Sequence, residues 1–118
     1  MLFIQYPACG TCQKAKKWLA EQGIEVEMRH IVQEQPTLDE LIAWISLSNL
    51  PVKKFFNTSG VLYRELGLKD KLPTMTEAEQ IILLSSDGKL VKRPLLISDA
   101  FVLVGFKPDD WAKALIAK

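Results

Sequence analysis

The sequence predicts an α/β fold, with a mixed four-stranded sheet, helices around it and an all-helical insertion. Three observations lead to this prediction: two apolar runs flank a helical pattern near the start, capped helical segments fill the middle, and two more apolar runs precede a last helix. The chain has 118 residues, 48% of them hydrophobic. This length suits one domain with a true core and is too short for two, so residues 1–118 are expected to form a single domain.

A short strand followed by a helix is expected at the start of the chain. Residues 2–6 form an apolar run, and Pro7 and Gly10 follow it, as is typical of a short buried strand that ends in a turn. Thr11 belongs to a residue type that favours helix caps, and Gly23 is a stop signal. The first helix is therefore expected between Thr11 and Gly23.

A second strand is expected over residues 24–31. Apolar and charged residues alternate there imperfectly, with Met28 and His30 among the positions expected to face inward. Because strand, helix and strand follow one another directly, the right-handed crossover rule makes the two strands parallel neighbours.

A block of helices is expected over residues 37–84. Thr37 with Glu40, and Thr76 with Glu79, match the capping box, in which each side chain bonds the backbone N–H of the other residue. The helical segments expected in this block are residues 38–48, 52–56, 61–66 and 75–84. The first of them has an apolar face made of Leu38, Leu41, Ile42, Trp44 and Ile45.

An antiparallel hairpin is expected after the helical block. Residues 90–97 and 100–104 are apolar runs joined by a polar turn, which predicts two paired strands. Arg93 and Pro94 interrupt the first run. A proline inside a strand marks an edge or another special position, and an X–Pro bond at a strand start is a candidate for the cis form.

A final helix is expected over residues 109–117, with Trp111, Leu115 and Ile116 inward. The predicted order is thus strand, helix, strand, helical block, strand, strand, helix. This order fits a thioredoxin-like mixed four-stranded sheet with an insertion.

Composition argues against a general affinity for nucleic acid or membranes. The net charge is +1 and the sequence pI is about 7.7, so no excess of basic charge draws the protein to an anionic surface. Residues 1–5 are apolar, but no basic segment precedes them, and the run is too short for a signal peptide or a spanning helix. The protein is expected in the cytoplasm, with no direct nucleic-acid or membrane partner.

The only two cysteines, Cys9 and Cys12, lie at the expected junction of the first strand and helix. In a reducing compartment this spacing indicates catalysis, sensing or metal binding, because permanent disulfides are rare there. The free N–H groups and positive dipole end of the helix favour a thiolate at Cys9. Cys9 is therefore expected to be the nucleophile, and Cys12, one turn further, the thiol that resolves a mixed disulfide.

Two other interpretations of the cysteine pair stay open. A structural zinc site usually has four protein ligands, and the chain offers two cysteines and His30, so no metal is expected unless a dimer shares the site. The other alternative is a pair of inert cysteines that only pack. No bound cofactor is expected, because the sequence has neither a dinucleotide fingerprint nor a phosphate-binding loop.

Four segments resemble the ArsC/Spx family of thioredoxin-fold proteins. They are YPACGTCQKAKKWL, NTSGVLYRELGL, KRPLLI and VGFKPDDW. The resemblance implies a catalytic cysteine at Cys9, a helical insertion over residues 37–84, and a cis proline at Pro94 beside that cysteine. Arg93 would then stabilise the Cys9 thiolate or an anionic substrate group, and Thr11 would cap the helix or donate its hydroxyl to the sulfur.

The arsenate reductases of this family hold their oxyanion with three arginines. Arg93 matches one of them, whereas Asn57 and Phe106 occupy the other two positions. Because arginine binds oxyanions through bidentate, charge-assisted contacts, weak arsenate reduction is expected. Lys54, Lys92 or Lys107 could supply part of the missing charge, but lysine is a point charge, and the ordinary interpretation of each is a solvated surface residue.

The sequence therefore predicts a small thiol–disulfide oxidoreductase that uses Cys9 and Cys12, with Thr11, Asn57 and Pro94 shaping the site. Its electrons would come from an external thiol reductant such as thioredoxin or glutathione. The alternative is an Spx-like redox-sensing regulator that binds the α subunit of RNA polymerase. That branch typically carries a basic C-terminal extension, which is absent after Lys118, so the regulator is the second expectation.

Overall fold

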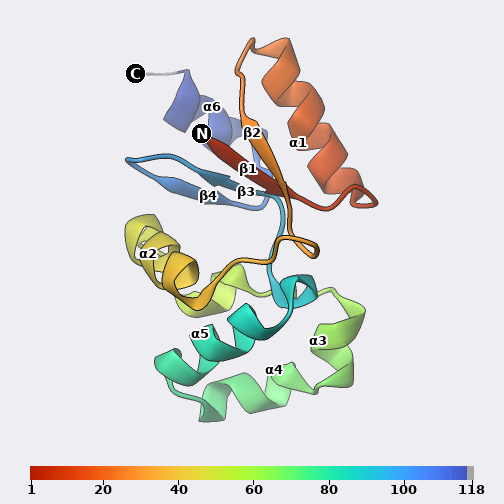
Figure 1. Ribbon diagram of the computed structural model, residues 1–118, viewed down its shortest axis with the longest axis vertical. Coiled ribbons are helices and arrows are strands. Elements are labelled where there is room, and N and C mark those ends of the chain that lie inside the picture. Colours follow the sequence, from red (N-terminus) through yellow and green to blue (C-terminus); the bar gives the residue numbers. More distant parts are fainter. Residues whose placement is uncertain (117–118) are drawn as a thin grey trace.

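A four-stranded sheet lies at the centre of the computed structural model, which describes residues 1–116 (Figure 1). The strands, in the order β2-β1-β3-β4, are β2 (Glu27–His30), β1 (Leu2–Gln5), β3 (Leu95–Ile97) and β4 (Val102–Val104). β1 pairs with β2 in parallel, and the β1–β3 and β3–β4 pairs are antiparallel. The predicted mixed sheet and its parallel first pair are confirmed.

Within residues 1–116, six α-helices form two groups around the sheet and beyond one of its ends. α1 and α6 lie at one end of the molecule, and the helices between β2 and β3 lie at the other (Figure 1). The helices are α1 (Gly10–Glu21), α2 (Leu38–Ser48), α3 (Val61–Glu65), α4 (Leu68–Lys71), α5 (Glu77–Ser86) and α6 (Pro108–Leu115). Three short 3₁₀ helices accompany them: Val52–Phe55, Leu72–Thr74 and Gly88–Leu90. The sequence did not predict α4 or the last two 3₁₀ turns, each only one turn long.

The two predicted capping boxes start α2 and α5. Thr37 accepts a hydrogen bond from the N–H of Glu40, whose carboxylate accepts from the N–H of Thr37. Thr76 and Glu79 repeat the arrangement. Each box satisfies N–H groups that a helix start leaves without partners, which is why these helix starts were predictable.

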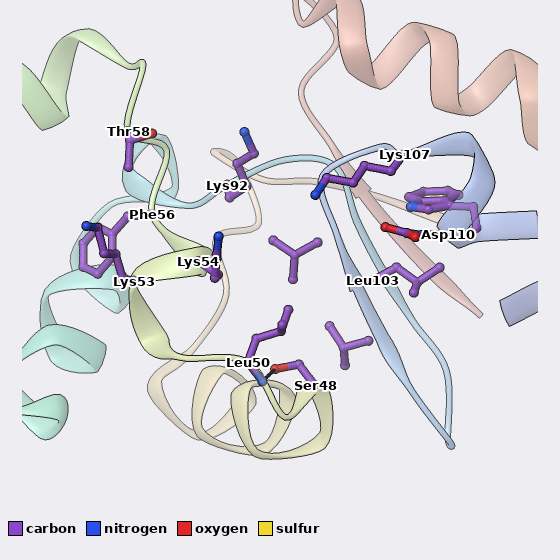
Figure 2. Close-up of a pocket in the computed structure, with 13 residues that line it drawn as sticks. Ser48, Leu50, Lys53, Lys54, Phe56, Thr58, Lys92, Leu103, Lys107 and Asp110 are labelled. Atoms are coloured by element: carbon purple, nitrogen blue, oxygen red, sulfur yellow. Dashed lines mark hydrogen bonds between the residues drawn. The ribbon is translucent and has the colours of Figure 1, made fainter. Parts of the chain in front are cut away.

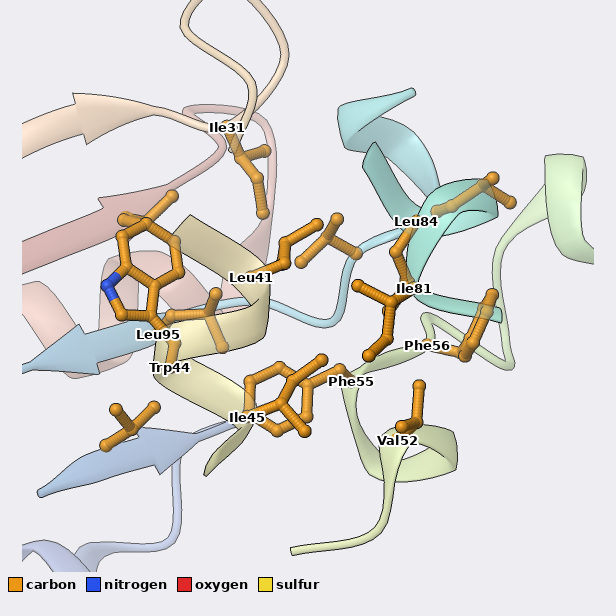
Figure 3. Close-up of a cluster of buried hydrophobic side chains, with 14 of the residues drawn as sticks. Ile31, Leu41, Trp44, Ile45, Val52, Phe55, Phe56, Ile81, Leu84 and Leu95 are labelled. Carbon is orange, nitrogen blue, oxygen red and sulfur yellow. The ribbon is translucent and has the colours of Figure 1, made fainter. Parts of the chain in front are cut away.

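The two faces of the sheet bury separate apolar clusters. Along β1, Phe3 packs with α1 and α6, whereas the next residue, Ile4, packs with the helices of the insertion. On β3, Leu96 packs in the cluster of Phe3, and Leu95 packs in the cluster of Ile4. Figure 3 shows the larger cluster, in which Leu95 lies near Trp44 of α2, and Ile81 and Leu84 of α5 belong to the same cluster. Because the inner strands are covered on both faces, they have continuous apolar runs in the sequence.

Several predicted boundaries and orientations were wrong. The strand expected over residues 90–97 begins only at Leu95, because the preceding residues turn away to bond the insertion. β2 covers only Glu27–His30, and Met28 is 43% exposed because β2 is an edge strand. Three more residues predicted to face inward are exposed: Leu38 and Ile42 on α2, and Ile116 just after α6. Ala117, the predicted end of the last helix, lies outside the described residues.

Arg29 ties β2 to the start of α2. Its guanidinium makes two hydrogen bonds to the Glu40 carboxylate, of 2.6 Å and 2.8 Å, and lies 5.8 Å from the centre of the Trp44 ring. The hydrogen bond from Arg29 lowers the pKa of Glu40 to about 2. The contribution of this carboxylate to stability is therefore present above its usual pKa of 4.5 and is lost as the pH falls toward 2.

No helix within residues 1–116 combines the length and the apolar character that a membrane crossing needs.

Candidate functional site

Cys9 caps the N-terminus of α1. Its backbone is extended, with φ −85° and ψ 117°, and its sulfur accepts a hydrogen bond from the backbone N–H of Cys12 at 3.3 Å. Thr11 was predicted as a cap, and this was wrong, because the helix begins at Gly10 and the capping side chain must precede it. The sulfur thus lies at the positive end of the helix dipole, which favours a thiolate.

The two thiols have different environments. Burial raises the pKa of Cys9, but hydrogen bonding with Cys12 and the nearby charge of Arg93 outweigh it, so this pKa lies below its usual value of 9.0. Cys12 is completely buried, and burial, followed by its interaction with Cys9, raises its pKa to about 12. Both cysteines are free thiols in this structure. Cys9 therefore ionises first, and Cys12 stays protonated behind it.

Arg93 lies beside the Cys9 thiol. Its guanidinium carbon is 4.8 Å from the centre of the Tyr6 ring, and its Nη1 atom is buried without a hydrogen-bond partner among the described residues. The Arg93–Pro94 peptide bond is cis, as predicted. Pro94 is not at an edge of the sheet, because it directly precedes the inner strand β3. A buried N–H group without a partner is unfavourable, so this guanidinium is suited to an incoming anionic group.

A pocket of about 340 Å³ opens over these residues. Four predicted site residues line it together: Cys9, Thr11, Asn57 and Arg93. Cys12 and Pro94 are buried and do not belong to this lining, so the structure brings only part of the predicted set to the pocket surface. The pocket is also lined by four residues that were not predicted as site residues: Ala8, Ser59, Gly60 and Val61. The last three belong to the segment NTSGV.

The insertion brings Asn57 to the Cys9 pocket. Asn57 N–H donates to the carbonyl of Leu90 at 2.8 Å, and Lys92 N–H donates to the carbonyl of Phe55 at 2.7 Å. These two bonds fix residues 55–57 against residues 90–92, next to Arg93. No local sequence signal reports such a pairing, because it joins segments more than thirty residues apart.

Phe106 and His30 do not line the Cys9 pocket and contact other parts of the protein. Phe106 packs against Trp111, with ring centres 5.0 Å apart, and is not part of the Cys9 pocket. His30 accepts hydrogen bonds through Nδ1 from the backbone N–H groups of Val32 and Gln33. Within residues 1–116, no three His, Cys, Asp or Glu side chains gather in a way that suits a metal ion.

Removing the guanidinium tests its effect on the thiolate. Arg93→Ala is expected to raise the pKa of Cys9, because a positive charge near the sulfur is lost. At pH 7 less thiolate is then present, so alkylation of Cys9 by iodoacetamide should slow several-fold, and its pH midpoint should rise. Lys17→Ala, which removes an exposed charge on α1, is the control. An unchanged midpoint in Arg93→Ala would show that Arg93 does not act on the sulfur.

The fold and the position of Cys9 together define a class of protein. A β-α-β unit, an antiparallel hairpin and a last helix around a mixed sheet, with a cysteine at the N-terminus of the first helix, are a thioredoxin-like arrangement. A family model described as the ArsC family matches residues 4–114. The chain belongs to the ArsC family, in the ArsC/Spx group, as the sequence had indicated.

Three similar proteins illustrate the range of this family. A crystal structure described as a putative ArsC family related protein from Bacteroides fragilis is 69% identical, covers 95% of this chain and 94% of its own, and has a TM-score of 0.93. A structure of a possible arsenate reductase from Streptococcus mutans is 40% identical, covers 92% and 94%, and has a TM-score of 0.84. The regulatory protein MgsR from Bacillus subtilis is 32% identical and covers 96% of this chain and 88% of its own. The proteins similar to this chain thus include one described as a possible arsenate reductase and one named as a regulatory protein.

Proposed function

We propose that this protein is a thiol–disulfide oxidoreductase in which Cys9 attacks and Cys12 resolves. The carrying observation is the asymmetry of the two thiols: the Cys9 sulfur caps α1 and lines a pocket with Arg93, while Cys12 is buried behind it. The first is favoured as a thiolate and the second as a thiol. This is the division of labour that a nucleophile and a resolving thiol require.

The reaction has two exchange steps. The Cys9 thiolate attacks one sulfur of a substrate disulfide, the substrate S–S bond breaks, and the leaving thiolate takes up a proton. Cys12 then loses its proton and attacks the Cys9 sulfur, which releases the second substrate thiol and forms the Cys9–Cys12 disulfide. The substrate gains two electrons and the protein loses two. An external thiol reductant, such as thioredoxin or glutathione, restores the dithiol.

Arsenate fits this pocket poorly. Arg93 is the one arginine in the pocket lining, Asn57 is neutral, and Phe106 lies in the aromatic cluster beside Trp111. Lys92 supplies a second positive charge, but as a point charge without the planar fork of arginine. These positions support the expectation of weak arsenate turnover.

A redox-sensing regulator is the second candidate function, and the similarity to the regulatory protein MgsR favours it. The chemistry at sulfur would be the same, but the disulfide would change the surface that a partner binds. Under this alternative the partner would be the α subunit of RNA polymerase. Either function would place the protein in the cytoplasm, without direct contact with nucleic acid or membrane.

The deciding experiment measures the redox potential of the Cys9/Cys12 pair together with turnover. Protein equilibrated across a glutathione series is alkylated and analysed by mass spectrometry, and the same samples are assayed with a model disulfide and with arsenate. A reversible disulfide with disulfide turnover is expected. A reversible disulfide without turnover would favour the regulator. If no disulfide forms at any potential, packing would be the only role left for the two cysteines. Arsenate turnover at the rate of genuine arsenate reductases would contradict the argument from the missing arginines.

A further inference from the structure

A larger pocket of about 840 Å³ lies beside the Cys9 pocket, and four lysines line it (Figure 2). We call it the lysine groove, after Lys53, Lys54, Lys92 and Lys107. Figure 2 shows Lys54, Lys92 and Lys107 around one end of the groove, and Leu50 and Leu103 at the other end. The groove therefore has a basic end and an apolar end.

The lining of the lysine groove is more positively charged than the rest of the protein. With four lysines and one acid, Asp110, its lining has a formal net charge of +3. The whole chain has a net charge of +1, so the remaining residues together carry −2. The one ion pair in the described part of the chain joins Arg29 to Glu40, which leaves the groove lysines without acidic partners among residues 1–116. Such a concentration of like charge attracts an anionic partner.

The lysine groove and the Cys9 pocket share a wall. Lys92 lines both of them. Along residues 56–59 the lining alternates: Phe56 and Thr58 belong to the groove, and Asn57 and Ser59 belong to the Cys9 pocket. Only Lys92 and residues 56–59 therefore separate a polypeptide bound in the groove from the Cys9 pocket.

We infer that the lysine groove docks an acidic polypeptide segment of the protein whose disulfide Cys9 reduces. The inference rests on the proposed oxidoreductase function for the reaction, but not for the binding. A polypeptide fits better than a small anion, because the charged and hydroxyl side chains of the lining are exposed or half-buried. The indole N–H of Trp111 is buried, but it already donates to the carbonyl of Gly105 at 3.0 Å and so offers no free donor to a small anion. The apolar end suits aliphatic side chains that accompany acidic ones.

Binding is tested with a fluorescein-labelled, cysteine-free peptide of alternating Glu and Leu, followed by fluorescence anisotropy. Lys54→Glu/Lys107→Glu reverses two charges of the groove. Lys16→Glu/Lys17→Glu reverses two charges on the exposed face of α1 and is the matched control, with the same net charge. The groove variant is expected to bind about tenfold more weakly than the wild type, and the control variant much as the wild type does. Added salt should weaken binding to the wild type.

Three results of the binding experiments would overturn the inference. Equal losses in the groove and control variants would show that only net charge matters. Equal binding of a peptide with Gln in place of every Glu would show that acidic side chains are not recognised. Binding of glutathione that the groove variant weakens, without binding of the acidic peptide, would assign the groove to a small anion.

The same variants separate this inference from the proposed function. A Glu-rich peptide that carries a disulfide serves as substrate, and the groove variant is expected to raise KM with little change in kcat. Peptide binding without any turnover would refute the oxidoreductase and retain the docking site. Turnover with the same KM in both variants would refute the docking site alone.

Discussion

Cys9→Ser is expected to abolish thiol–disulfide exchange, with turnover reduced at least about a thousandfold. The serine hydroxyl keeps the size of the side chain and accepts the hydrogen bond from Cys12 N–H, so the start of α1 should stay intact. The nucleophile alone is then lost. Steady-state turnover with a model disulfide measures the first effect, and urea unfolding measures the second.

Cys12→Ser is the matched variant, because it removes the other thiol from the same helix. The mixed disulfide on Cys9 is then expected to persist, since no second thiol lies behind the sulfur to attack it. Intact-protein mass spectrometry should detect the adduct, unless free glutathione releases it and sustains turnover. If both variants lose stability equally and neither of them, Cys9→Ser included, loses thiol–disulfide exchange, the cysteines serve packing and the proposed function falls.

Gly88→Ala is expected to cause the largest loss of stability, about 3 kcal/mol. A Cβ at this position would lie 1.9 Å from the carbonyl oxygen of Ile31 and 2.8 Å from its carbon. Both atoms belong to the backbone, so the chain after β2 or the 3₁₀ turn Gly88–Leu90 must move. Urea unfolding at equilibrium measures the change in the free energy of unfolding.

Gly10→Ala is the control for this substitution. A Cβ at Gly10 would meet no atom within 4 Å, and the residue is helical, so its stability should be equal or slightly higher. If Gly88→Ala unfolds at the same urea concentration as Gly10→Ala, the close approach of Gly88 to Ile31 does not constrain the fold. The turn at Gly88 also leads into Arg93, so Gly88→Ala is expected to slow alkylation of Cys9.

Local sequence patterns predicted the kinds of elements well and their limits less well. Both capping boxes start helices, because capping depends only on residues three apart in the chain. The strand predicted over residues 90–97 was too long, because Val91 pairs with Phe56 of the insertion instead of extending β3. Apolar residues alone do not tell which partner their backbone will bond.

At the candidate site, too, the sequence predicted the kind of element but not its limits. The cysteine pair and its place at a helix start were predictable, because the strand, the turn and the helix that hold them are contiguous. The cap was assigned to Thr11, although the sulfur of Cys9 takes that role. The start of the helix differed from the prediction by two residues, and that difference decides which side chain faces the free N–H groups.

By itself, the sequence determined the order of elements, the βαβ start, the capped helices and the chemistry available at two thiols, because each depends on residues close together in the chain. Only the tertiary structure decided which groups surround those thiols. Asn57, Arg93 and the lysine groove come together because backbone hydrogen bonds join residues 55–57 to residues 90–92. Burial and neighbouring charge set the pKa of each thiol, and both arise only when distant segments pack.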